Sequence, residues 1–143
     1  MIRLSSSPKE TNRIAEEFAR TLVGGELILL EGELGAGKTA FVQGVAAELG
    51  VKSAVRSPTF AVMNVHSVDH PAIKHLVHCD FYRFKKPEEA LELGLDEWLG
   101  NPHAVIFAEW PNLAKPFLVA KNIIEINFEA LDANTRRVTF LAA

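Results

Sequence analysis

The chain has 143 residues and a formal net charge of −3, with 48% hydrophobic and 23% charged residues. This length predicts a single domain that buries its own core, and the acidic balance argues against a protein that holds nucleic acid by its own phosphate contacts. The single cysteine excludes an intrachain disulfide. Because no run approaches the roughly 18 apolar residues of a membrane span and the first residues lack a signal-peptide pattern, we expect a cytoplasmic protein with no membrane partner.

The first expected element is a helix that starts at Pro8. Residues 7–10, Ser-Pro-Lys-Glu, form a capping-box pattern with proline at the first helical position. Apolar residues then recur every four positions, at Ile14, Phe18 and Leu22. The pair Gly24-Gly25 is expected to end the helix. The continuously apolar run at 27–30 follows, and it is typical of a strand that is covered on both faces, as in a parallel sheet.

A second helix is expected at 38–49, with Gly50 as its stop. Further on, apolar stretches at 60–65 and 73–81 flank a turn-like segment at 67–71, which predicts an antiparallel pair of strands. The remaining expected elements are a short helix at 87–93, a buried strand at 104–108, and a closing strand pair at 123–128 and 137–141. Together these elements predict an α/β fold with a mixed parallel and antiparallel sheet.

The segment between the first strand and the second helix is Gly32-Glu33-Leu34-Gly35-Ala36-Gly37-Lys38-Thr39, which matches the P-loop pattern Gly-x-x-x-x-Gly-Lys-[Ser/Thr]. Its glycines let backbone N–H groups wrap a phosphate, and the following helix presents its N-terminus to the anion. Lys38 is expected to reach the β- and γ-phosphates, and the Thr39 hydroxyl to bind Mg²⁺. We therefore expect residues 1–143 to form a single P-loop ATPase domain with three layers. The residues expected to hold ATP here are Glu33, Gly35, Ala36, Gly37, Lys38, Thr39 and Ala40.

Two acidic residues are candidates for the metal side of this site. Glu109 ends the buried strand at 104–108, where P-loop enzymes usually place an acid close to Mg²⁺. Asp80 ends the preceding strand, and it could orient the attacking water or be an ordinary strand-end aspartate. Thr59 could contact the metal or the water, or it could belong to a plain turn built on Pro58. The expected catalytic residues are thus Lys38, Thr59, Asp80 and Glu109, with Thr39 and Glu109 as metal ligands.

Several histidines lie close together along the chain, at positions 66, 70, 75 and 78. They fall in a strand–turn–strand pattern, in which an i, i+4 pair does not share a helical face. No Cys-x-x-Cys or His-Glu-x-x-His pattern accompanies them. We therefore expect solvated or core histidines rather than a zinc site.

The order of four motifs resembles the TsaE family, also known as YjeE. The motifs are the P-loop, Ser57-Pro58-Thr59-Phe60, the run His78-x-Asp80-x-Tyr82-Arg83, and a strand that ends in Glu109-Trp110-Pro111. The resemblance spans nearly the whole chain and implies an ATPase of bacterial tRNA threonylcarbamoyladenosine biosynthesis, weakly active alone. It also implies that the protein binds TsaD- and TsaB-type partners and reaches tRNA only through them, in tRNAs that read codons starting with A.

The resemblance also implies roles for individual residues. Carried over by position, these are Thr39 and Glu109 for Mg²⁺, Asp80 for activity, Thr11 and Trp110 near the nucleotide base, and Arg137, alternatively Arg136, as the arginine of the last strand. The guanine-reading pattern Asn-Lys-x-Asp is absent from the sequence, which favours adenine. Two other functions stay open from the residues alone: a small-molecule kinase that shares the P-loop, and a non-catalytic switch that signals by binding a nucleotide.

Overall fold

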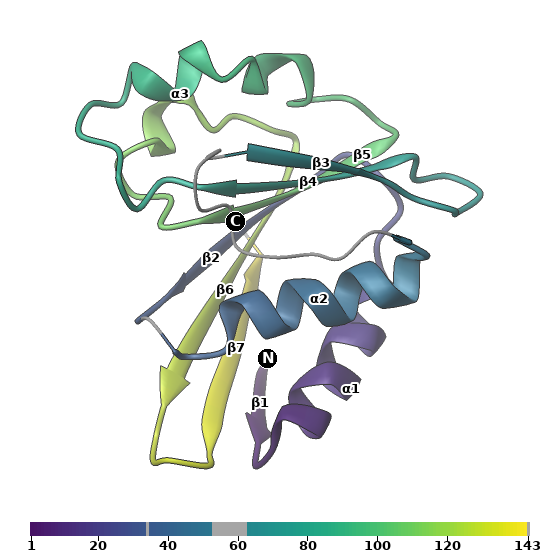
Figure 1. The fold of residues 1–143 in the computed structure, drawn as a ribbon, viewed down its shortest axis with the longest axis vertical. Helices are drawn as coiled ribbons and strands as arrows, with labels where there is room; N and C mark the ends of the chain where they lie inside the picture. The colour runs from purple at the N-terminus through teal and green to yellow at the C-terminus, as the bar shows by residue number, and fades with distance from the viewer. Residues whose placement is uncertain (34, 53–62, 143) are drawn as a thin grey trace.

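The computed structural model of the chain describes residues 1–33, 35–52 and 63–142, which form one seven-stranded sheet and its helices (Figure 1). The strands lie in the order β1-β7-β6-β2-β5-β4-β3. The elements in chain order are β1 (Ile2–Ser5), α1 (Pro8–Ala19), β2 (Glu26–Gly32), α2 (Lys38–Leu49), β3 (Met63–Ser67), β4 (His75–Asp80), α3 (Glu89–Glu92), η1 (Leu95–Glu97), β5 (Ala104–Glu109), η2 (Lys115–Phe117), β6 (Asn122–Ala130) and β7 (Arg136–Ala142). No helix in these described ranges is both long and apolar enough to cross a membrane.

The centre of the sheet is parallel, and antiparallel strands flank it. β2 pairs in parallel with β5 and β6, and β4 pairs in parallel with β5. β3 joins β4 in the antiparallel direction, and β7 and β1 extend the other side in the same way. The predicted mixed sheet is therefore confirmed. Because β2, β5 and β4 run in one direction, their carboxyl ends lie at one edge of the sheet, with Glu109 paired to both Leu30 and Asp80.

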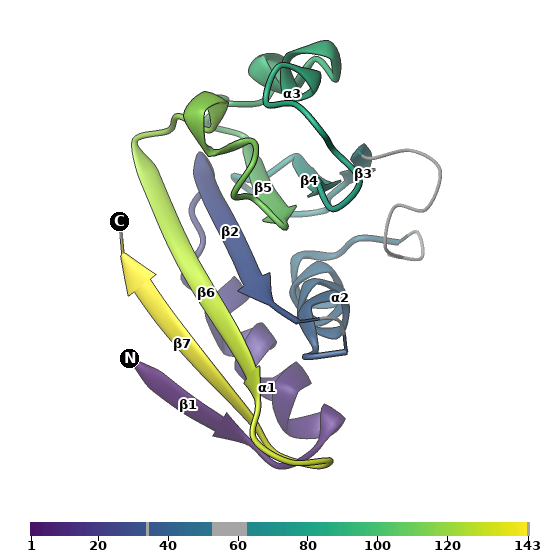
Figure 2. The same cartoon turned by 90° about the vertical axis from the view of Figure 1, so that its left-hand side faces the viewer.

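Helices cover both faces of the central strands, which gives the expected three layers. In Figure 1, α3 lies above β3 and β4, and α2 lies below them; Figure 2 shows α1 beside α2 on that lower face. The core under α1 and α2 contains Ile28 and Leu30 of β2, and the core on the other face contains Leu27 and Leu29. Successive residues of β2 therefore enter opposite cores, as the apolar run at 27–30 predicts.

The start of α1 follows the predicted pattern, with one change in a hydrogen bond. The Ser7 hydroxyl accepts a hydrogen bond from the N–H of Glu10 at 3.1 Å, while the Glu10 carboxylate accepts from the N–H of Ser6 rather than of Ser7. The helix ends at Ala19, before Gly24-Gly25. A tight turn follows the helix, in which the N–H and the hydroxyl of Thr21 both donate to the carbonyl of Phe18.

Other elements differ from expectation mainly at their ends. Strand β1 was not predicted, because its four residues are too short to show a period. The strand predicted at 60–65 is described from Met63 onward, and its earlier residues lie outside the described ranges. The helix predicted at 87–93 is the single turn Glu89–Glu92, which continues through Gly94 into η1.

Gly44 sets the distance between α1 and α2. A Cβ at this position would lie 2.8 Å from the Cβ of Ala15 and 3.0 Å from Oδ1 of Asn12, so a side chain there forces the helices apart. Gly44→Val is therefore expected to lower the free energy of unfolding by about 1–3 kcal/mol, the usual cost of overpacking. Urea denaturation measures the change. Ala47→Val is the control, because Ala47 is exposed on the same helix and valine costs at most about 0.7 kcal/mol in helix propensity there. Equal losses in both variants would contradict a tight helix contact at Gly44.

Candidate functional site

Two glycines of the P-loop meet requirements that other residues do not meet. Gly37 directly precedes α2, and its φ of 103° lies in the left-handed region that favours glycine. No described atom lies within 4 Å of a Cβ built at Gly37, so the restriction there is one of conformation rather than space. At Gly32 space is also limiting, because a Cβ would lie 2.5 Å from the carbonyl oxygen of Phe128 on β6. The loop therefore begins at a glycine that packs against β6 and ends at a glycine that directly precedes α2.

Lys38 is the first residue of α2 and is buried, with 4% of its surface exposed. Its Nζ donates a hydrogen bond to the carbonyl of Gly32 at 2.5 Å and lies 3.7 Å from the centroid of the Trp110 ring. Burial lowers the pKa of Lys38, while the charges of Glu109 and Asp80 act in the opposite direction. Among the described residues, the Lys38 ammonium has no carboxylate in ion-pair contact. A cation is thus held inside the loop by a carbonyl and an aromatic face.

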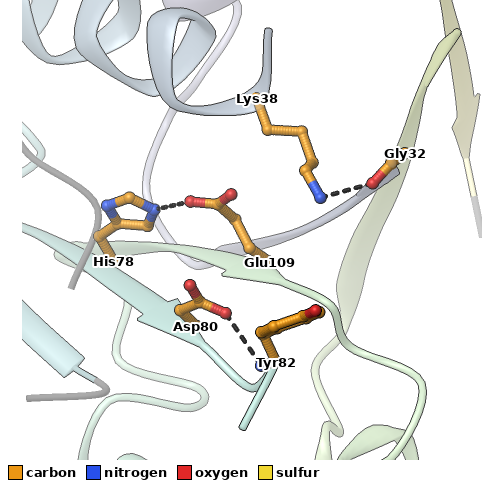
Figure 3. A network of polar contacts seen from close by, with 6 residues as sticks. All are labelled: Gly32, Lys38, His78, Asp80, Tyr82 and Glu109. Carbon is orange, nitrogen blue, oxygen red and sulfur yellow. Dashed lines mark hydrogen bonds and ion pairs between the residues drawn. The ribbon is translucent and has the colours of Figure 1, made fainter. Parts of the chain in front are cut away.

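Glu109 ends β5 and is also buried, with 4% of its surface exposed. Its Oε2 lies 2.5 Å from Nε2 of His78, whose ring on β4 is fully buried. Because side chains alternate along a strand, His78 and Asp80 lie on one side of β4. Figure 3 shows these three residues gathered at the ends of β4 and β5, across from Lys38.

Asp80 ends β4 beside Glu109 and is half-buried. Its Oδ1 accepts a hydrogen bond from the backbone N–H of Tyr82 at 2.9 Å. Burial raises the pKa of the Asp80 carboxyl and the charge of Glu109 adds to this, whereas the bond from Tyr82 opposes it. A carboxylate with a raised pKa holds a proton more tightly than a solvated one, which suits a group that orients or deprotonates water.

Two cavities adjoin the P-loop and share Gly35, Gly37 and Ala40. The first, of about 230 Å³, is also lined by Lys38, Thr39, Asp80, Glu109 and Trp110. The second, of about 430 Å³, is also lined by Ser6, Ser7, Pro8, Thr11, Ala133, Asn134 and Arg136. The charged lining of the first cavity suits phosphates and a metal ion. The second lies in the range of about 300–1,000 Å³ that small-molecule sites occupy, and it suits the rest of a nucleotide.

A larger cavity, of about 600 Å³, lies beside β6 and is lined in part by Glu31, Glu33 and Glu129. Among the described residues, no lysine or arginine lines this larger cavity to offset the repulsion between its carboxylates and the phosphates of a nucleotide. Lys38 and Arg136 line the two cavities beside the P-loop, so these fit a nucleotide better. Glu33, which the sequence predicts at the nucleotide, lines this acidic cavity instead.

The structure brings most of the predicted site residues together and separates a few. Trp110 lies beside Lys38 and lines the first cavity, whereas Thr11, which was expected near the same nucleotide base, lines the second. The Thr11 hydroxyl is already paired with the hydroxyl of Ser5 at 2.7 Å. Ala36 is buried behind the loop. Thr59 lies outside the described residues.

Of the two arginines in β7, Arg136 lines the second of the two cavities beside the P-loop. Its Nη2 donates to the carbonyl of Gly35 at 3.4 Å, whereas Arg137 pairs with Glu129 at 3.4 Å. Neighbouring residues of a strand point to opposite faces, so the two arginines do not substitute for one another. The structure therefore favours Arg136 over the predicted Arg137 at this site.

His78 contacts a residue of the candidate site, but sequence reasoning assigned it no role of its own. It was expected to be solvated or in the core, and it is in the core, yet its polar contact is with the candidate metal ligand Glu109. The signal that was available is its spacing of two residues from Asp80 on one strand. In the ranges that the structure describes, no group of histidine, cysteine or acidic residues forms a ready metal cage.

Known proteins resemble the chain over nearly its whole length. The family model described as threonylcarbamoyl adenosine biosynthesis protein TsaE matches residues 5–138. Proteins named tRNA threonylcarbamoyladenosine biosynthesis protein TsaE from Rickettsia bellii and Aquifex aeolicus are 38% and 40% identical, over 92% of this chain and 88% and 89% of their own lengths. The Bacillus subtilis protein of the same name is 35% identical over 95% of this chain and 82% of its own length.

A solved structure gives the same result for the fold. The crystal structure of Bacillus subtilis YdiB superposes with a TM-score of 0.81 and 30% sequence identity, and the match covers 99% of this chain and 84% of that chain. The sequence match, the shared fold and the P-loop geometry agree. The chain belongs to the TsaE family.

Proposed function

We propose that the protein hydrolyses ATP with Mg²⁺ and, together with TsaD- and TsaB-type partners, supports the formation of threonylcarbamoyladenosine in tRNA. The observation that carries the ATPase is the convergence of Lys38, Thr39, Asp80 and Glu109 on one cavity beside the P-loop. The pathway is supported by relatives 38% and 40% identical that are named for this biosynthesis. Such a role fits the cytoplasm, with tRNA reached only through the partners.

Lys38 and the N-terminus of α2 are the proposed phosphate-binding groups. The Lys38 ammonium now donates to a neutral carbonyl, that of Gly32. A phosphate oxygen offers it a charge-assisted hydrogen bond, which is roughly twice as strong as a neutral one. The backbone N–H groups at the N-terminus of α2 and the dipole of that helix favour the same anion.

Thr39 and Glu109 are the residues proposed to hold Mg²⁺. Both line the first cavity, and the described residues contain no larger group of metal ligands. This small donor set fits Mg²⁺, which usually takes only one or two carboxylates from the protein and completes its shell with phosphate oxygens and water. When bound, the ion neutralises charge on the phosphate oxygens.

Asp80 is proposed to orient the water that attacks the γ-phosphate. Its half-buried carboxylate lines the same cavity as Lys38. The water forms a bond to phosphorus as the bond to the bridging oxygen breaks, so positioning and charge stabilisation supply most of the catalysis. Thr59 stays a second candidate for contacting the water or the metal.

Lys38→Ala and Glu109→Ala test the proposed hydrolysis. Each is expected to slow phosphate release from ATP at least about 100-fold, because a group that stabilises developing charge contributes about 10²–10³-fold to turnover. Release is measured alone and with the TsaD- and TsaB-type partners, since the protein alone is expected to be weak. Lys115→Ala and Glu129→Ala are matched controls for the measurement without partners, because both side chains are partly exposed and lie outside the cavity.

Three results would redirect the proposal. Normal turnover in Glu109→Ala would rule out its metal role. Phosphate transferred to a metabolite, rather than released, would favour a small-molecule kinase. Threonylcarbamoyladenosine formed with a non-hydrolysable ATP analogue would favour a switch that acts by binding alone.

Asp80→Asn is expected to raise the free energy of unfolding at neutral pH while it lowers ATP hydrolysis. The raised pKa means that the folded protein binds the Asp80 proton more tightly than the unfolded chain does, so the wild type loses stability as pH rises from the ordinary value of 3.8 to the raised value. Asparagine avoids this loss and keeps an oxygen for the N–H of Tyr82. Urea unfolding over a pH series, without nucleotide, should show a gap between the two proteins that widens from acid to neutral pH. A gap that is independent of pH would contradict the raised pKa.

A further inference from the structure

His78 is a buried polar side chain that the proposed hydrolysis does not use. It lies on β4, one of the parallel strands whose ends form the site, and none of its surface is exposed. Its Nε2 lies 2.5 Å from Oε2 of Glu109 (Figure 3). Its Nδ1 has no hydrogen-bond partner among the described residues. The ring therefore directs its one polar contact at the acid that is proposed to bind Mg²⁺.

This contact is also what holds the Glu109 carboxylate. Within the described ranges, the Glu109 side chain makes no other hydrogen bond or ion pair, and the nearby Lys38 donates to Gly32 instead. A glutamate side chain has more rotatable bonds than a histidine, and the His78 ring is enclosed by the core. A rigid ring that bonds a flexible carboxylate limits the orientations which that carboxylate can adopt.

The hydrogen bond to His78 occupies one carboxylate oxygen of Glu109 and leaves the other available for a ligand. Oε2 of Glu109 contacts His78, and Figure 3 shows Oε1 pointing away from the ring. Thr39, the other proposed Mg²⁺ ligand, lines the cavity that Glu109 lines. Mg²⁺ demands a nearly ideal octahedral shell, so a ligand whose orientation is fixed in advance loses less freedom when the ion binds.

We propose that His78 is a positioning residue, which holds Glu109 through Oε2 and thereby leaves Oε1 to bind Mg²⁺. The inference rests on the proposed function, because it requires Glu109 to be a metal ligand. In this role Nε2 carries the hydrogen, because an ionised carboxylate only accepts hydrogen bonds. A purely structural histidine would stabilise the fold without changing the response to Mg²⁺.

The test compares two replacements that differ in one hydrogen bond. His78→Leu fills the core but cannot donate. His78→Gln carries an N–H group at a similar reach from the backbone, so it can donate to Glu109. For each variant, isothermal titration calorimetry measures the affinity for a non-hydrolysable ATP analogue over a series of Mg²⁺ concentrations and in EDTA. Urea unfolding of the same samples reports the stability of the fold separately.

His78→Leu is expected to raise the Mg²⁺ concentration for half-maximal effect by about 10-fold or more, the usual cost of removing a residue that orients a metal ligand. Its affinity in EDTA is expected to match that of the wild type, because Lys38 and the other proposed phosphate-binding groups of the P-loop are unchanged. His78→Gln is expected to restore most of the Mg²⁺ response. Should His78→Leu fail to fold, His78→Asn replaces it, since its shorter amide falls short of Glu109.

Two results would overturn the inference about His78. One is an unchanged Mg²⁺ response in His78→Leu, with only stability lowered. The other is a glutamine variant as impaired as the leucine variant. Glu109→Gln separates this failure from that of the proposed function: if Glu109→Gln also responds normally to Mg²⁺, the metal role of Glu109 is itself wrong. If Glu109→Gln loses the response and His78→Leu keeps it, only the positioning role is refuted.

Discussion

The common direction of β2, β5 and β4 is the constraint on which the rest of the site depends. The P-loop leaves β2, Glu109 ends β5 and Asp80 ends β4, and all three leave the sheet at one edge. No local sequence signal joins these segments; the parallel ladder and the two cores do. A shift of one residue in either acidic strand would turn its carboxylate to the opposite face, because side chains alternate along a strand.

Because helices cover both faces of the sheet, the charged groups of the site are buried or half-buried, and this shifts the pKa of Lys38 and of Asp80. Lys38 and Glu109 are each only 4% exposed, and Asp80 is half-buried. Burial disfavours the charged form, and it therefore lowers the pKa of Lys38 and raises the pKa of Asp80. The same dry surroundings strengthen electrostatic interactions with a bound anion or cation.

The sequence predicts those parts of the site that depend on neighbouring residues in the chain better than those that depend on contacts between distant strands. The P-loop could be predicted because its glycines and Lys38 serve one short turn, and the positions of Asp80 and Glu109 followed from apolar strands that end in an acid. The choice between Arg136 and Arg137 could not be predicted, because it depends on which face of β7 lies next to the P-loop. The contact of His78 depends on a partner in another strand, so its spacing of two residues from Asp80 indicates a shared side of β4 but does not reveal Glu109 as the partner. Strand β1 was missed because four residues are too short to show a period and because its partner, β7, lies at the other end of the chain.

Gly32 has a consequence for how this sequence can vary. Its carbonyl accepts from Lys38, and its α-carbon lies so close to β6 that any side chain would meet the backbone oxygen of Phe128. The obstacle is main chain, so no change of side chain at position 128 makes room for a larger residue at position 32. A larger residue at position 32 therefore requires β6 to move, so we expect single substitutions of Gly32 to be tolerated very rarely. The sheet thus fixes the first glycine of the motif independently of what the loop binds.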